Sequence, residues 1–333
     1  MIKRARELFP GTIIAFITAL SAQYLAELYA APVMLFALLL GMALNFLSEQ
    51  ENCCPGIQFS STTVLRVGVA LLGLRITLYQ VHSIGYANLL VVALGVAATM
   101  LLGTLLAKWY RQAPLFGLLT GGSVAICGAS AAMAISAVLP HSPHREKQVV
   151  FTVLCVTTLS TIAMILYPLI VEYFDLTDSA AGIFIGGTIH DVAQVVGAGY
   201  GISTEVGDIA TITKLFRVLM LLPVFLVLGY IFRGQPGSAA TGKLPLPWFV
   251  SAFVVLMLVA TIDLLPTYIV ENGLRASRFC LIMAITALGM KTNLRILVKG
   301  SGSAILLVLI ETLFLGGVIL AWIIWNQAPI NGA

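Results

Sequence analysis

Apolar runs of about 20 residues follow one another along the whole chain of 333 residues. The hydrocarbon core of a bilayer is about 30 Å thick, and an α-helix needs a run of this length to cross it. Only 10% of the residues are charged, whereas soluble proteins carry about 25%. The sequence therefore predicts an all-α polytopic membrane protein, with residues 1–333 forming one transmembrane domain.

The apolar runs divide into continuous and interrupted segments. Two segments, 113–139 and 180–200, are as apolar as the others but are interrupted by glycines and polar residues. Together with the continuous runs they predict about 9–11 transmembrane segments, two of them discontinuous. The continuous helices are expected at about 9–29, 31–48, 60–80, 87–110, 147–173, 209–232, 246–265, 274–290 and 302–326.

The two interrupted segments share a pattern. Gly121-Gly-Ser-Val-Ala-Ile-Cys-Gly-Ala-Ser130 and Gly186-Gly-Thr-Ile-His-Asp-Val-Ala-Gln194 both open with paired glycines and a hydroxyl residue, a composition that breaks helices. A break at membrane depth leaves backbone groups that only protein or a water-lined cavity can satisfy. In transporters, the half-helix N-termini at such breaks point N–H groups at the substrate. We therefore predict that the two segments are facing halves of one substrate site.

Ten residues of these two segments are expected to bind substrate. The first segment offers hydroxyls and backbone N–H groups without any charge, which suits an anion. The alternative is that the small residues serve close helix packing, most clearly between Ala129 and Ala134. The ten residues are Gly121, Gly122, Ser123, Cys127, Gly128, Ser130, Gly186, Gly187, Thr188 and Gln194.

His190 and Asp191 are ionisable residues at membrane depth, where such residues are costly and mark substrate or proton paths. Histidine titrates nearest to neutral pH, so we expect this pair to couple transport to protons. The alternative is a hydrogen-bonded pair that holds the broken backbone. Lys214 and Arg217, one turn apart, are expected to bind the oxyanion, with snorkelling to the membrane interface as their alternative role.

The charged loops favour a re-entrant hairpin at 113–139. Basic loops stay in the cytoplasm, so the N-terminus, with Lys3, Arg4 and Arg6, is expected inside and to lead into a retained helix, not a cleaved signal peptide. A hairpin keeps the basic loop near Arg145 inside and sends the acidic loop near Glu172 outside. Broken helices that cross fully are the rival layout, which changes few loop charges.

Two internal similarities support inverted repeats. Residues 121–123 fall on 186–188 when shifted by 65, and residues 73–78 fall on 289–294 when shifted by 216. With the hairpin, helices 60–80 and 274–290 come out antiparallel, and both similarities become inverted repeats. Arg275 and Arg278 are exceptions to the positive-inside trend, because this topology places them outside.

The sequence gives no indication of a cofactor, a metal site or nucleic-acid binding. Cysteines in apolar segments are expected to behave as small hydrophobic residues. An intramembrane enzyme that uses Ser123 or Cys127 with His190 is a remote alternative, because Asp191 is poorly placed to orient the base. We therefore expect no enzyme. The expected partners are a small inorganic or organic anion and the lipid bilayer; an anion channel and a homodimer are left open.

Three motifs resemble the YeiH family of bacterial inner-membrane proteins, described as sulfate exporters: the stretch 121–131, the stretch 187–197, and Thr213-Lys-Leu-Phe-Arg-Val218. The likeness covers nearly the whole chain. It implies a secondary transporter of a small sulfur oxyanion, namely sulfate, sulfite or a small sulfonate. The family is similar in turn to cation/proton antiporters and bile-acid sodium symporters. That distant likeness implies inverted repeats of about five helices with crossing broken helices.

Overall fold

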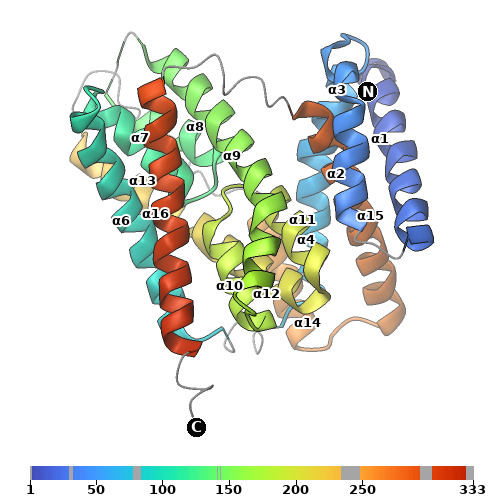
Figure 1. The fold of residues 1–333 in the computed structure, drawn as a ribbon. Coiled ribbons are helices and arrows are strands. Elements are labelled where there is room, and N and C mark those ends of the chain that lie inside the picture. The colour runs from blue at the N-terminus through green and yellow to red at the C-terminus, as the bar shows by residue number, and fades with distance from the viewer. Residues whose placement is uncertain are drawn as a thin grey trace. The chain divides into compact units, whose positions relative to one another are not determined.

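The computed structural model describes residues 2–29, 33–77, 84–140, 142, 144–233, 248–292 and 302–327, without the side chains of residues 2–5, 146 and 327. All regular secondary structure in these ranges is helical (Figure 1). This confirms the prediction of an all-α polytopic membrane protein. Six helices of the described ranges are long and apolar enough to cross a membrane: Arg6–Tyr29, Tyr86–Trp109, Lys147–Tyr173, Thr204–Ile231, Thr267–Lys291 and Gly302–Asn326.

The described residues group into two compact units. Unit 1 comprises those among 1–83, 196–208 and 247–293, and unit 2 comprises those among 84–195, 209–246 and 294–333. Two helices, α11 (Val192–Ile202) and α12 (Thr204–Leu219), begin in one unit and end in the other.

In unit 1, α4 packs antiparallel on α15. Ser277 of α15 donates a hydrogen bond of 2.6 Å to the Gly68 carbonyl of α4, and Leu74 lies against Gly273. This confirms that the helices predicted at 60–80 and 274–290 are antiparallel. The helices of unit 1 are α1 (Ile2–Tyr29), α2 (Val33–Ala43), η1 (Asn45–Glu49), α3 (Cys54–Phe59), η2 (Ser60–Val64), α4 (Leu65–Leu72), α14 (Trp248–Thr261) and α15 (Thr267–Lys291).

The predicted helices at 31–48 and 60–80 have different bounds in the structure. The first gives way at Leu44 to a short 3₁₀ turn, η1. The second begins earlier, at Cys54, passes through the π-helical stretch η2 and ends at Leu72. The partners of the predicted repeat at 78 and 293–294 lie outside the described residues.

Unit 2 contains the first interrupted segment and both breaks, and the second interrupted segment continues into unit 1 from residue 196. The long helices α6 and α16 pack side by side (Figure 1), and α7 packs against both. The segment predicted as one helix at 209–232 is divided into α12 and α13. The remaining elements are α6 (Tyr86–Trp109), α7 (Pro114–Ala125), α8 (Ala129–Val138), α9 (Arg145–Tyr173), α10 (Asp178–Thr188), α13 (Leu221–Ile231) and α16 (Gly302–Gln327).

The first interrupted segment is a hairpin. Ile135 of α8 lies against Gly122 of α7, although an uninterrupted helix would place residues so spaced about 20 Å apart. Gly117 packs on Gly103 and Gly121 on Thr99, so α7 runs back along α6. The chain therefore enters on α7, turns midway along α6, and returns on α8 to the side where α9 begins.

The second interrupted segment is a hairpin from the opposite side. α10 runs back along α9, because the rings of Phe184 and Tyr167 lie 5.0 Å apart and the Asp191 N–H donates to Ser160. α10 runs parallel to α12, since Gly182 packs on Ile209 further from the break. Only one residue separates α11 from α12, so α11 returns to the side where α10 begins. The 29 residues of α9 span about 43 Å, which places the two hairpins on opposite faces.

The paired glycines lie inside helices and are not the breaks. Gly121 packs on the backbone of α6 and Gly186 on the backbone of α12, at positions where a methyl group would collide. The chain breaks several residues later, at 126–128 and 189–191. The prediction that the paired glycines open the breaks was wrong, because glycine in a helix costs only about 1 kcal/mol and permits close packing.

The hairpin topology predicts the sidedness of three exposed positions. In a variant without native cysteines, Arg111→Cys and His144→Cys should react with a membrane-impermeant maleimide from one face, because α7 and α8 enter and leave there. Asp175→Cys, beyond the spanning helix α9, should react only from the other face. Labelling of intact and inverted vesicles measures this. Reaction of positions 111 and 144 from opposite faces would show that 113–139 crosses fully.

Candidate functional site

The two breaks lie side by side within unit 2. A methyl group added at Gly128, in the first break, would lie 3.8 Å from both the Cβ and the carbonyl oxygen of His190, in the second. Gly128 has φ 62°, in the left-handed region that favours glycine. The two discontinuities that the sequence placed in facing positions are therefore in contact.

Arg217 of α12 binds the C-terminal ends of both α7 and α10. Its Nε donates to the Ala125 carbonyl at 2.8 Å and its Nη2 to the Val124 carbonyl at 2.9 Å. Its Nη1 donates to the carbonyls of Gly186 and Ile189, at 3.1 and 2.9 Å. These acceptors belong to the last turns or the breaks, where a helix leaves its carbonyls unsatisfied. One guanidinium group thus supplies hydrogen-bond donors to the C-terminal ends of two helices.

Lys214, one turn earlier on α12, repeats the arrangement. Its Nζ donates to the Ile126 carbonyl of the first break at 2.7 Å and to the Ile189 carbonyl of the second at 2.9 Å. Lys214 and Arg217 are both fully buried. These buried contacts do not fit the alternative role of the two residues, which was snorkelling to the membrane interface.

The charge at the breaks is positive on balance. Each helix C-terminus is equivalent to about half a negative charge, so the ends of α7 and α10 offset only part of two cations. The N-termini of α8 and α11 add positive ends at the same breaks. Asp191 interacts electrostatically with Lys214 and is the nearby acidic group. The centre of unit 2 therefore favours a further negative charge.

His190 is fully buried and holds one hydrogen bond to α16. Its Nε2 lies 3.0 Å from the Thr312 hydroxyl, which itself donates to the Val308 carbonyl at 2.8 Å. Because that hydroxyl has one proton, it either donates to Val308 and accepts from Nε2–H, or donates to an unprotonated Nε2. Nδ1 has no hydrogen-bond partner among the described residues. In either tautomer one nitrogen of the neutral ring carries no proton and can bind one.

Gln194 is also buried beside the second break. Its amide nitrogen lies 3.4 Å from the Thr161 hydroxyl of α9, and its carbonyl oxygen has no partner within the described part of the chain. Gln194 and His190 therefore each keep one unused polar atom at the centre of unit 2, as expected of groups that meet a ligand or water.

The predicted hydroxyl ligands serve their own helices. Ser123 donates to the Leu119 carbonyl and Thr188 to the Phe184 carbonyl, both at 2.5 Å. Cys127 is buried, and Ser130 is half-buried on α8. Within the described ranges no hydrogen bond joins Ser123 or Cys127 to His190, so the pair that a nucleophilic enzyme needs is not formed there.

Glu311 is a buried acidic residue that the sequence analysis did not select. It lies midway along α16, fully buried, and its Oε1 is 2.8 Å from the Thr120 hydroxyl of α7. Oε2 has no partner among the described residues. The signal was available, because one acidic residue stands in the middle of the apolar run 302–326.

The hydroxyl of Thr120 has two neighbours but one proton. It lies 3.2 Å from the Gly117 carbonyl and 2.8 Å from Glu311. If it donates to the carbonyl, a protonated Glu311 can donate to it. If it donates to Glu311, the carboxylate accepts. The geometry therefore accommodates both protonation states of Glu311.

Metal ligands do not gather in the described residues: no group of three His, Cys, Asp or Glu side chains could hold an ion there. The chemistry available at the breaks is that of two cations, a histidine, a carboxylate and an amide. Such a set can bind an anion through the cations and exchange a proton through the histidine or the carboxylate.

The comparisons with known proteins agree with a membrane protein. The family model described as "Conserved hypothetical protein 698" matches residues 10–308. UPF0324 membrane protein CT0845 of Chlorobaculum tepidum is 48% identical, over 95% of this chain and 89% of the relative. UPF0324 membrane protein RB0971 of Rhizobium meliloti is 48% identical, over 94% and 91%. UPF0324 membrane protein TauZ of Paracoccus denitrificans is 48% identical, over 92% of each chain. No solved structure matches the chain.

Removing either central cation should destabilise the protein. Lys214→Met and Arg217→Met leave buried carbonyls without donors, at about 1–3 kcal/mol for each unsatisfied group. Arg217→Met should have the larger effect because four hydrogen bonds are lost. Thermal unfolding in detergent measures this, with the exposed Lys108→Met on α6 as the control. Midpoints equal to the control would show that the helix ends do not depend on these donors.

Proposed function

Because the chain belongs to the UPF0324 family of multi-pass membrane proteins, we propose that it is a secondary transporter. Its substrate is a small sulfur oxyanion, namely sulfate, sulfite or a small sulfonate, which it exports across the bacterial inner membrane with proton coupling. The N-terminus lies in the cytoplasm, as its basic residues favour.

One observation carries the proposal: two opposed hairpins meet at their breaks, and a buried cation pair lies between them. Lys has three N–H donors and Arg has five. Two donors of Lys214 and four of Arg217 are used by carbonyls. One N–H of each cation is left for an oxyanion, beside the N-termini of α8 and α11.

The buried position of this centre suits alternating access. Lys214, Arg217, His190 and Gln194 are fully buried in unit 2. A substrate site closed to both faces prevents leakage, and transport requires opening to one face at a time. A channel would instead need a continuous open path, so the closed centre favours a transporter over the alternative of an anion channel.

Proton coupling has a chemical basis at the same centre. Binding an anion between the cations offsets positive charge around His190 and so favours a second proton on its ring. Asp191, which interacts with Lys214, is the second proposed carrier. Glu311 is a third candidate, since an unpaired ionised carboxylate at membrane depth is costly and a proton removes that cost.

Transport by purified protein in liposomes tests the function. Sulfite or sulfate uptake should saturate with concentration and follow an imposed pH gradient. His190→Gln should abolish the response to the gradient, because the titratable ring is lost, and Asp191→Asn should at least halve it. Flux that rises linearly with anion concentration and ignores the gradient would indicate a channel. Unchanged pH dependence in both variants would remove the coupling role of this pair.

Glu311→Gln should separate binding from coupling. The amide keeps the size of the side chain and its hydrogen bond to Thr120 but cannot release a proton. We expect the anion affinity of this variant to stay within about twofold of that of the wild type, which is a difference of about 0.4 kcal/mol in binding free energy. Gradient-driven uptake should fall at least tenfold. The exposed Glu172→Gln at the end of α9 is the matched control. Full gradient-driven uptake by Glu311→Gln would show that Glu311 has no part in coupling.

A further inference from the structure

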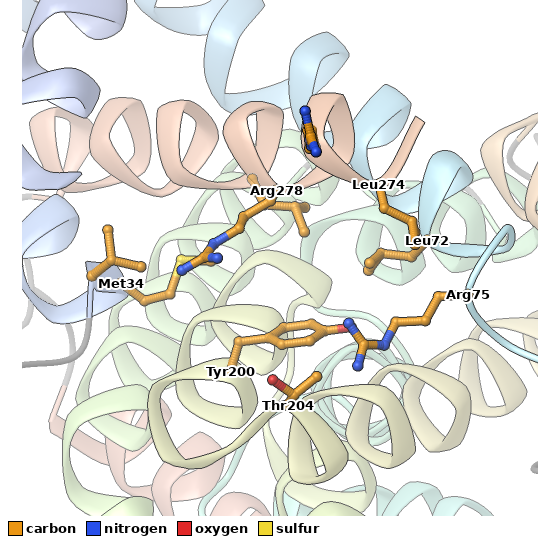
Figure 2. Close-up of a pocket in the computed structure, with 10 residues that line it drawn as sticks. Met34, Leu72, Arg75, Tyr200, Thr204, Leu274 and Arg278 are labelled. Atoms are coloured by element: carbon orange, nitrogen blue, oxygen red, sulfur yellow. The ribbon is translucent and has the colours of Figure 1, made fainter. Parts of the chain in front are cut away.

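Unit 1 contains a cavity of about 300 Å³ that is separate from the breaks in unit 2 (Figure 2). Residues of α2, α4, α11, α12 and α15 line it, together with Arg75, which lies three residues after the end of α4. Its volume lies at the lower end of the range for ligand sites, about 300–1,000 Å³. The polar residues that line it are Arg75, Arg275, Arg278, Tyr200 and Thr204.

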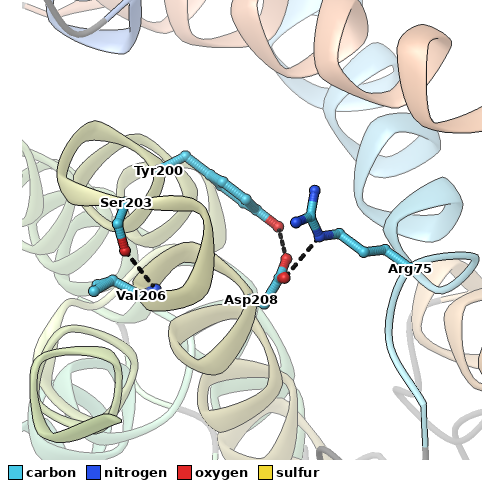
Figure 3. Close-up of polar contacts among 5 residues, drawn as sticks. All are labelled: Arg75, Tyr200, Ser203, Val206 and Asp208. Atoms are coloured by element: carbon cyan, nitrogen blue, oxygen red, sulfur yellow. Dashed lines mark hydrogen bonds and ion pairs between the residues drawn. The ribbon is translucent and has the colours of Figure 1, made fainter. Parts of the chain in front are cut away.

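Arg75 is held in place but keeps most of its donors. Its Nε donates to Asp208 at 2.7 Å, and the other carboxylate oxygen of Asp208 accepts from the Tyr200 hydroxyl at 2.6 Å (Figure 3). Asp208 is only 5% exposed and both its oxygens are engaged. The terminal nitrogens of Arg75 make no hydrogen bond to the described residues, so they can bind a ligand.

Arg278 supplies a charge without a protein partner. It is exposed, and it makes no hydrogen bond or ion pair with the described residues. Figure 2 shows the ring of Tyr200 between Arg278 on one side and Arg75 on the other. The third arginine, Arg275, reaches Glu271 only at 4.0 Å, and both side chains are exposed, so that pair is weak.

The positive-inside rule does not account for the positions of Arg275 and Arg278. Basic residues concentrate on the cytoplasmic side of membrane proteins. The cavity is lined in part by Thr204, the first residue of α12, which is followed by the acidic Glu205. Arg275 and Arg278 were the two exceptions to the charge pattern, and the structure brings both to this cavity. Binding of an anionic ligand would account for Arg275 and Arg278, which the positive-inside rule does not.

The remaining wall of the cavity is apolar. It is formed by Val33, Met34, Leu72, Leu274 and Leu281. An inorganic anion such as sulfate would contact the guanidinium groups and leave this wall uncovered. A short hydrocarbon group attached to the anion would cover it, and each CH₂ removed from water contributes about 0.8 kcal/mol.

We infer that unit 1 carries a second binding site, which takes a small organic oxyanion with its charged head bound by Arg278 and the other arginines of the lining and its short apolar tail against Leu72 and Met34. The guanidinium groups supply paired N–H donors to the oxygens of the head. The site rests on this cavity alone and not on the proposed transport. Only the choice of a sulfonate as the probe follows from the proposed function.

Isothermal titration of purified protein with propane-1-sulfonate tests the site. Binding should be at least tenfold weaker in Arg278→Gln than in the wild type, because the unpaired charge is lost. Arg66→Gln, the same change on α4 away from the cavity lining, should bind as the wild type does. Sodium sulfate should bind at least tenfold more weakly than propane-1-sulfonate, and propylammonium should not bind. Arg278 is exposed, so its replacement leaves the fold intact.

Three results would overturn the inference. The first is equal affinity of Arg278→Gln and the wild type for propane-1-sulfonate. The second is loss of binding in Lys214→Met but not in Arg278→Gln, which would place the anion at the breaks and support the proposed function instead. The third is loss of binding in nanodiscs of phosphatidylglycerol but not of phosphatidylcholine, which would assign the cavity to a lipid headgroup.

Discussion

Every backbone group inside a bilayer needs a partner, and the hydrogen bonds of Lys214 and Arg217 meet that need where two helices stop. Without them, the last carbonyls of α7 and α10 would face a low-dielectric interior unpaired. Arginine suits the task because its planar group reaches several acceptors at once. The helix breaks and the cation pair are therefore one arrangement, in which each part supplies hydrogen-bond partners to the other.

The same contacts join three elements. Each cation bonds to carbonyls from both hairpins, so α12 fixes the position of one hairpin relative to the other. Charge and geometry are thus coupled at the centre of unit 2. A ligand that withdrew one cation from its carbonyls would loosen both hairpins together, which is the kind of two-state element on which a conformational change can depend.

The sequence predicts much of this fold because membrane insertion leaves few choices. The lengths of the apolar runs predicted the helices, and the charges of the loops favoured the hairpins over fully crossing helices. The position of the breaks was missed, because paired glycines serve close packing as well as helix breaking, and only the neighbouring helix decides between these roles. The carbonyl partners of Arg217 stand about 30 and 90 positions away, a pairing that no local pattern encodes. Glu311 could have been found as an acidic residue in an apolar run.

The left-handed conformation of Gly128 restricts how this protein can diversify. A side chain there would add roughly 1–2 kcal/mol of strain in addition to contacts with His190. Position 128, at the tip of the first hairpin, is therefore limited to main-chain atoms. Under the proposed transport function, selectivity among anions would therefore have to come from side chains at positions other than Gly128.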